Sequence, residues 1–151
     1  MTLAFEFEPV SEADFDALLA LRIAVMRASL ERIGRFDPQR AAQRFRSTFR
    51  AADTRRVRVG TEPAGCVALW TEPDALRIEH FYLDAPFQRR GLGAAVLHRL
   101  FAEAPSQATP FRVAALRGSD ANRFYERHGF VKVSESEFDI EYERVFGPPP
   151  A

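Results

Sequence analysis

Apolar and polar positions change their spacing along the chain, and each change predicts a new element. Residues 3–8 alternate between apolar and polar side chains, a pattern that predicts a half-buried strand. From residue 15 to residue 33 the apolar positions recur at helical spacing, and Gly34 then supplies a stop. Asp37 and Pro38 are typical of the N-cap and first position of a helix, so a second helix is predicted directly afterwards.

The rest of the chain alternates short strand patterns with helical ones. Strands are predicted at 55–59, 65–71, 75–83, 111–116, 130–135 and 140–146, and helices at 91–103 and 120–128. The strand, helix and strand between residues 75 and 116 predict a right-handed parallel crossover. We therefore expect an α/β (α+β) fold, with a mixed, mostly antiparallel central sheet of about seven strands and helices on both faces.

No repeat and no internal boundary interrupts this pattern, so a single domain is expected over residues 1–151. Its core would span residues 3–146, and the Pro-rich segment 147–151 would form a flexible tail. The composition agrees with this reading, because 46% hydrophobic and 28% charged positions in 151 residues are typical of one folded domain.

Charge and cysteine content exclude several classes of protein. Lys+Arg and Asp+Glu each number 21, and this balance does not favour a nucleic-acid partner. No apolar run approaches the roughly 18 residues of a membrane span, and residues 1–10 lack the basic start of a signal peptide. The one cysteine, Cys66, lies in an apolar stretch and is expected to be a small buried side chain without a disulfide. We therefore expect a cytoplasmic protein that has no membrane partner.

The segment from Ile78 to Ala94 combines a predicted strand, a turn, and a helix start that contains Gly91 and Gly93. Free N–H groups at a helix N-terminus form an anion site, and glycines let a phosphate approach the main chain. A Walker phosphate loop is excluded because Ala94, not lysine, follows Gly93. A dinucleotide fingerprint is excluded because Val96 occupies its third glycine position. The alternative interpretation is a tight turn with close helix packing.

Two motifs of this sequence together resemble the GNAT superfamily of N-acetyltransferases. The hexapeptide Gln88-Arg89-Arg90-Gly91-Leu92-Gly93 matches the family's acetyl-CoA signature, Gln/Arg-x-x-Gly-x-Gly/Ala, at every fixed position. Downstream, residues 121–130 are similar to the family's tyrosine-bearing helix, which ends in a Gly-Phe turn. The resemblance implies an acetyl-CoA-dependent N-acetyltransferase that acetylates a primary amine of a small molecule or peptide by direct attack in a ternary complex. It also implies a homodimer.

The resemblance further implies which residues hold acetyl-CoA. Main-chain amides from residue 89 to residue 94 would bind the pyrophosphate, and residues 81–83 would pair with the pantetheine arm as an added strand. Where the family commonly has an asparagine that contacts this arm, the chain has Ser119, and Asn122 follows shortly after. The implied cosubstrate-binding residues are Phe81, Tyr82, Leu83, Gln88, Arg89, Arg90, Gly91, Leu92, Gly93, Ala94, Ser119 and Asn122.

Catalytic roles follow from the same resemblance. Tyr125 occupies the general-acid position, where a phenol would protonate the departing thiolate, and Glu79 resembles the glutamate that some members use as a general base. The alternative interpretations are a core side chain for Tyr125 and an ordinary solvent-facing carboxylate for Glu79. His80 is the fallback base. No metal is predicted, because the three histidines lack metal-ligand spacing.

The acceptor site is implied to lie among the first two helices and the last strands, with Arg22, Met26 and Trp70 as candidate residues. Arg22 lies four positions from both Leu18 and Met26, on an otherwise apolar helix face. A buried charge needs a partner, so Arg22 is expected to meet either an internal carboxylate or the carboxylate of an amino-acid-like substrate. Trp70 is either core or a wall of the acceptor pocket. A non-catalytic acyl-CoA-binding module with the same fold is the alternative function.

Overall fold

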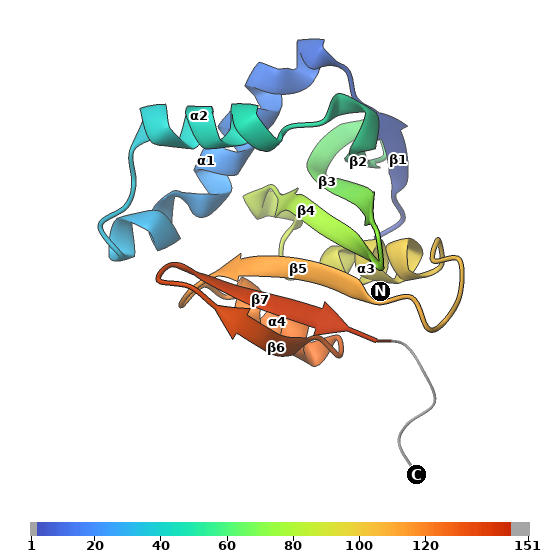
Figure 1. Ribbon diagram of the computed structural model, residues 1–151. Helices are drawn as coiled ribbons and strands as arrows, with labels where there is room; N and C mark the ends of the chain where they lie inside the picture. Colours follow the sequence, from blue (N-terminus) through green and yellow to red (C-terminus); the bar gives the residue numbers. More distant parts are fainter. Residues whose placement is uncertain (1–2, 146–151) are drawn as a thin grey trace. The chain divides into compact units, whose positions relative to one another are not determined.

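A computed structural model describes residues 3–145 of the chain, and seven strands of this part form one sheet (Figure 1). The strands are β1 (Glu6–Pro9), β2 (Thr54–Val59), β3 (Glu62–Glu72), β4 (Ala75–Leu83), β5 (Phe111–Leu116), β6 (Val131–Glu135) and β7 (Asp139–Arg144). Their order in the sheet is β1-β2-β3-β4-β5-β7-β6. β4 and β5 pair in parallel, whereas β1 with β2, β2 with β3, β5 with β7 and β6 with β7 pair antiparallel. The predicted mixed, mostly antiparallel sheet is confirmed.

Four α-helices and three short 3₁₀ turns connect the strands. The helices are α1 (Phe15–Arg32), α2 (Pro38–Thr48), α3 (Leu92–Phe101) and α4 (Ala121–Arg127), and the turns are η1 (Glu12–Asp14), η2 (Ala51–Asp53) and η3 (Ala85–Phe87). The element order is the predicted one, and α3 provides the predicted crossover between β4 and β5. None of the described helices is long and apolar enough to cross a bilayer.

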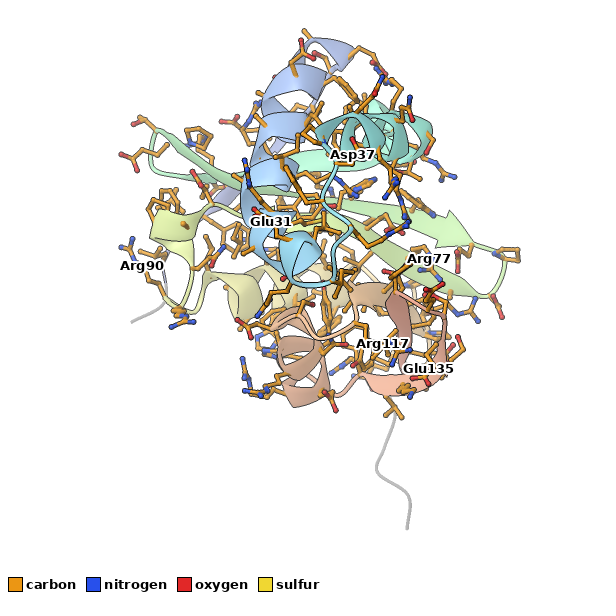
Figure 2. The ribbon with its side chains drawn as sticks, turned by 90° about the vertical axis from the view of Figure 1, so that its left-hand side faces the viewer. Glu31, Asp37, Arg77, Arg90, Arg117 and Glu135 are labelled. Carbon is orange, nitrogen blue, oxygen red and sulfur yellow. The ribbon has the colours of Figure 1, made fainter. Side chains whose placement is uncertain are left out.

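Local signals set the helix boundaries. The Asp37 carboxylate accepts hydrogen bonds from the main-chain N–H groups of Gln39 and Arg40, at 2.9 and 3.3 Å, so it is the N-cap of α2 (Figure 2). Pro38 occupies the first helical position, where its missing N–H costs nothing. Beyond α1, Gly34 has a φ of 69°, a left-handed conformation that ends the helix.

The turn before β3 is shorter than the sequence pattern predicts. The pattern places a turn at residues 60–64, but β3 begins at Glu62 and pairs Pro63 with Arg58. The register shifts between Val57 and Arg58, and such a bulge lets a strand continue through a proline, which has no N–H to donate. The first strand is also shorter than expected, because β1 begins at Glu6. Residue 146 and the predicted tail at 147–151 lie outside the described residues.

The described residues divide into two compact units, which the strands β3 and β4 both enter. The first unit contains residues 3–68 and 80–95, and the second contains residues 69–79 and 96–145. The expected single domain stays a prediction.

Each unit has its own buried side chains. In the first unit, α1 and α2 pack against each other, and a cluster is formed by Leu18, Phe45, Phe49, Cys66 and Tyr82. Cys66 is fully buried, as expected, and burial raises the pKa of its thiol to about 12. In the second unit, α4 packs against β5. The buried side chains of this unit include Phe111, Val113, Tyr125, Phe130 and Tyr142.

Candidate active site

The turn between β4 and α3 has an unusual main-chain conformation. Arg89 has a φ of 60° and Gly91 a φ of 80°. Glycine adopts such angles freely, but an arginine in the left-handed region costs roughly 1–2 kcal/mol. Turns that change handedness in this way make successive N–H groups point to one side, a concavity that binds anions.

The main-chain N–H groups from residue 89 to residue 94 donate no hydrogen bond to any described residue. The first N–H with an acceptor is that of Ala95, which donates to the Gly91 carbonyl at 3.1 Å and begins the hydrogen-bond ladder of α3. The preceding amides are therefore available to a ligand at the positive end of the α3 dipole. Arg89 and Arg90, both exposed, add positive charge beside them. This arrangement can bind a phosphate or diphosphate.

Side chains of the same segment fasten the turn to the first unit. The Gln88 side-chain amide donates to the Leu83 carbonyl at 2.7 Å, which ties the turn to the last residue of β4. Arg90 Nη1 donates to the Pro86 carbonyl at 3.1 Å, and Figure 2 shows where this side chain lies. Leu92, the first residue of α3, is fully buried and anchors the helix start. Gln88 thus shapes the turn and leaves its main-chain amides available to a ligand.

The end of β4 approaches β3 closely. A Cβ placed on Gly65 of β3 would lie 2.2 Å from the Tyr82 carbonyl oxygen, so only glycine fits at this position. His80 has a φ of 47°, which bends β4 just before residues 81–83. The parallel pairing of β4 with β5 involves Leu76 and Arg77, near the beginning of β4.

A chain of hydrogen bonds joins β4 to α1 and α2 within the first unit. The Thr48 hydroxyl donates to the Arg44 carbonyl at 3.0 Å, so it accepts at 2.8 Å from Nε2 of His80. Nδ1 of His80 then has a free lone pair and accepts the Tyr82 hydroxyl hydrogen at 3.1 Å. The Tyr82 oxygen in turn accepts from Nη1 of Arg22 at 2.7 Å.

His80 serves the fold in this geometry. Its side chain is 6% exposed, and both ring nitrogens are hydrogen-bonded. Burial, together with the positive charge of Arg22, lowers the pKa of His80 to about 4, so the imidazole is neutral at physiological pH. An imidazole whose lone pair already accepts the Tyr82 hydroxyl hydrogen is not free to take a proton from a substrate. The geometry therefore argues against His80 as the fallback base.

Arg22 meets a phenol where the sequence suggests a carboxylate. Its guanidinium donates to Tyr82, and within residues 3–145 no Asp or Glu forms an ion pair with it. Its Nε atom is buried and has no hydrogen-bond partner among these residues. Met26, a further candidate on α1, packs against the hydrophobic cluster of the first unit. Sequence reasoning identified Arg22 but not Tyr82 as its partner.

The second unit contains Ser119, Asn122 and Tyr125. Nδ2 of Asn122 donates to the Leu116 and Ser119 carbonyls, both at 2.9 Å, and its Oδ1 accepts the Tyr142 hydroxyl at 2.8 Å. Asn122 therefore joins the end of β5, the start of α4 and β7. A direct bond to the pantetheine arm, which the resemblance implies, would have to displace these contacts.

Tyr125 lies on α4 and is 5% exposed. Its ring contacts those of Phe130 and Tyr142, with centroids 5.4 and 6.3 Å apart. The Tyr125 carbonyl accepts from the Phe130 N–H at 3.1 Å, so the turn after α4 folds back on the tyrosine. Gly129, with a φ of 89°, makes this turn possible.

Glu79 belongs to a charged network on β4, β5 and β7 in the second unit. Arg77 lies 4.0 Å from Glu79 and 2.8 Å from Glu72, and it also pairs with Glu141 of β7 (Figure 2). Arg112 of β5 continues the network through Glu72, Asp74 and Glu143. Hydrogen bonds from Arg112 lower the pKa of Asp74. Glu79 thus lies beside the positive charge of Arg77.

Sequence reasoning missed this network. The sequence does show charged side chains alternating along these strands. Which of them become partners depends on the register in which the strands pair, and the sequence pattern does not give that register. Trp70, the remaining acceptor candidate, lies on β3 in the same unit and is half-buried. Among residues 3–145, no three His, Cys, Asp or Glu side chains are grouped so that they could hold a metal ion.

Comparison with known proteins places this geometry in a family. The family model described as the acetyltransferase (GNAT) domain matches residues 26–142, a range that includes the turn before α3 and all of α4. No curated protein matches the chain.

Solved structures share the fold at low sequence identity. An acetyltransferase from Thermus thermophilus is 18% identical, with a TM-score of 0.71, over 97% of this chain and 100% of that one. The PaiA N-acetyltransferase from Thermoplasma acidophilum, in complex with coenzyme A, is 13% identical, with a TM-score of 0.72, over 95% and 100% of the two chains. N-acetylglutamate synthase from Neisseria gonorrhoeae, complexed with coenzyme A and N-acetyl-glutamate, is 15% identical, with a TM-score of 0.65, over 98% of this chain and 36% of that one.

Replacing His80 with glutamine tests the buried neutral imidazole. An unfolded histidine titrates near pH 6.5 and folded His80 near 4, so below pH 6.5 the unfolded chain binds a proton that the folded chain does not. As the pH falls from 6.5 to 4, His80 alone should therefore lower the free energy of unfolding of the wild-type protein by at most about 1.4 kcal/mol per pH unit. Urea unfolding should show that, from pH 7 to pH 5, His80→Gln loses about 2 kcal/mol less of its free energy of unfolding than the wild-type protein does.

Arg32→Gln is the control, because Arg32 is exposed and its side chain donates to Ser29, so this variant should keep the pH dependence of the wild-type protein. If His80→Gln and the wild-type protein lost the same free energy of unfolding between the two pH values, His80 would titrate normally in the folded state.

Proposed function

The chain belongs to the GNAT acetyltransferase family, and on this premise we propose that it transfers an acetyl group from acetyl-CoA to a primary amine. The acceptor is a small molecule or a peptide, and the amine attacks the thioester directly in a ternary complex. The observation that supports this proposal most strongly is the run of unengaged main-chain amides at residues 89–94. The negative charge of a diphosphate linker complements these donors.

The main-chain amides at 89–94 bind the pyrophosphate of the cosubstrate. The α3 dipole alone contributes only about 0.3–1 kcal/mol for an exposed anion, so the N–H groups themselves must supply most of the affinity. Each hydrogen bond to a charged oxygen is worth about 1.5–3 kcal/mol. The main chain of residues 81–83, at the end of β4, binds the pantetheine arm as an added strand.

The transfer forms a C–N bond and breaks the C–S bond. Glu79 takes the proton that the attacking amine must lose, and Arg77 lies 4.0 Å from its carboxylate. Tyr125 gives its hydroxyl proton to the departing thiolate. A main-chain amide of residues 81–83 stabilises the oxyanion of the tetrahedral intermediate.

Gly91→Ala should weaken coenzyme A binding. An alanine at a φ of 80° strains the turn, and its Cβ would stand at the main chain that receives the pyrophosphate. Loss of one or two of these hydrogen bonds corresponds to a rise in the dissociation constant of about 10- to 100-fold, measured by titration calorimetry.

Gly60→Ala is the matched control, because Gly60 also has a positive φ, 61°, and an added Cβ there would meet nothing within 4 Å. Equal loss of affinity in both variants would show that backbone strain, and not the phosphate site, causes the effect. No heat with coenzyme A or acetyl-CoA in the wild-type protein would contradict the proposed function itself.

Tyr125→Phe should lower kcat by about 10²- to 10⁴-fold and leave the affinity for coenzyme A nearly unchanged, because only the proton donor is lost. The measurement is coenzyme A release with a panel of amines. Tyr142→Phe is the control, since it removes a neighbouring hydroxyl that donates to Asn122 and has no role in the chemistry. Full turnover in Tyr125→Phe would show that another group is the acid, and coenzyme A binding without release on any amine would favour a non-catalytic acyl-CoA-binding module.

A further inference from the structure

Arg22 carries a positive charge into the apolar side of α1. Its neighbours on this face, Leu18 and Met26, belong to or pack against the hydrophobic cluster of the first unit. The Arg22 side chain is half-buried, and its Nε is buried without a hydrogen-bond partner among the described residues. A buried donor without an acceptor is costly, so the position of this guanidinium requires a reason.

Within residues 3–145, no group around Arg22 neutralises its charge. The Tyr82 hydroxyl oxygen accepts from Nη1, but the hydroxyl hydrogen goes to His80, so the phenol remains neutral. His80 is neutral as well. The guanidinium also lies near the face of the Tyr82 ring, 5.9 Å from its centroid, which adds an attraction but no negative charge.

Two other arginines, one on α1 and one on α2, differ from Arg22 in this respect. Arg27 pairs with Glu31 at 2.7 Å (Figure 2), and Arg46 pairs with Glu12 at 2.9 Å. Both pairs are well exposed, where a counter-ion contributes little. Arg27 and Arg46 thus have carboxylate partners in solvent, whereas the half-buried Arg22 has none among the described residues.

We propose that the acceptor of this enzyme is an amine that also carries a carboxylate, as an amino acid does, and that Arg22 binds this carboxylate. The inference rests on the proposed function and names the substrate class of the same site. Tyr82 accepts one hydrogen of Nη1, and the remaining hydrogens of the two terminal nitrogens can form the charge-assisted bonds that carboxylates accept from arginine.

The position of Tyr82 connects this site to the reaction. Tyr82 lies within residues 81–83, the segment proposed to bind the pantetheine arm, so the carboxylate binds beside the strand that carries the thioester. A short molecule with its amine close to its carboxylate fits this arrangement. The hydrogen-bond chain through His80 to Thr48 fixes the Tyr82 hydroxyl, and this hydroxyl holds the guanidinium in place.

Matched acceptor pairs test the inference. Coenzyme A release is measured for amino acids and for the corresponding amino acid amides, which keep the amine and side chain but lose the negative charge. The wild-type protein should prefer the acid by about 10- to 100-fold in kcat/KM, the range expected for hydrogen bonds to a charged group. Arg22→Met should abolish the preference through a higher KM for the acid, and Arg22→Lys should retain part of it.

Arg27→Met is the matched control, because this exposed arginine on the same helix should leave the preference intact. Arg22→Lys retains a positive charge, and it keeps the test valid if Arg22→Met does not fold. The same acid and amide pairs are also titrated calorimetrically into the protein in the presence of coenzyme A.

Two results would overturn the inference. One is equal use of acid and amide by the wild-type protein together with equal binding heats. The other is a loss of coenzyme A affinity in Arg22→Met as large as the loss of acid binding, which would assign Arg22 to the coenzyme phosphates. A third result separates the two proposals. If the wild-type protein released heat with the acids and Arg22→Met did not, but no amine caused thiol release, the carboxylate site would be supported and only the proposed acetyl transfer would be contradicted.

Discussion

The account of this protein depends on main-chain N–H groups that the described fold leaves without acceptors. At residues 89–94 the chain turns through positive φ angles at Arg89 and Gly91 before α3 begins its own hydrogen bonds at Ala95. Every helix begins with N–H donors that need an acceptor from outside the helix, and an arginine rarely takes a left-handed conformation. Both features are explained if an anion completes the turn, and the bend costs little compared with the hydrogen bonds a diphosphate would form.

β4 connects the two binding sites proposed for the first unit. Its last carbonyl, at Leu83, accepts the Gln88 side chain that fastens the phosphate turn. Just before this residue, Tyr82 and His80 form the hydrogen-bond chain that holds Arg22 and reaches α2 at Thr48. Gly65 lets β3 approach this end of β4 at a distance that no other residue would allow. The same short stretch of strand therefore positions the groups proposed for the cosubstrate and for the acceptor.

The sequence predicted those features of the fold that depend only on residues close together in the chain. The bounds of β4 and β5 agree with the alternation of apolar residues, and the cap of α2 follows from Asp37 and Pro38 alone. The contact between Arg22 and Tyr82 joins positions 60 residues apart, and helical spacing showed only which face Arg22 occupies. The ion pairs of Arg77 with β7 likewise depend on the strand register, which tertiary pairing decides.

The most direct test of the central claim is a titration followed by amide NMR of the main chain. Coenzyme A should shift the N–H resonances of residues 89–94 strongly, because a charged oxygen replaces water at these donors. Pantetheine, which lacks the pyrophosphate, should leave those resonances in place and shift only the amides of β4. If coenzyme A shifted amides elsewhere and left residues 89–94 unchanged, the turn would not be the phosphate site.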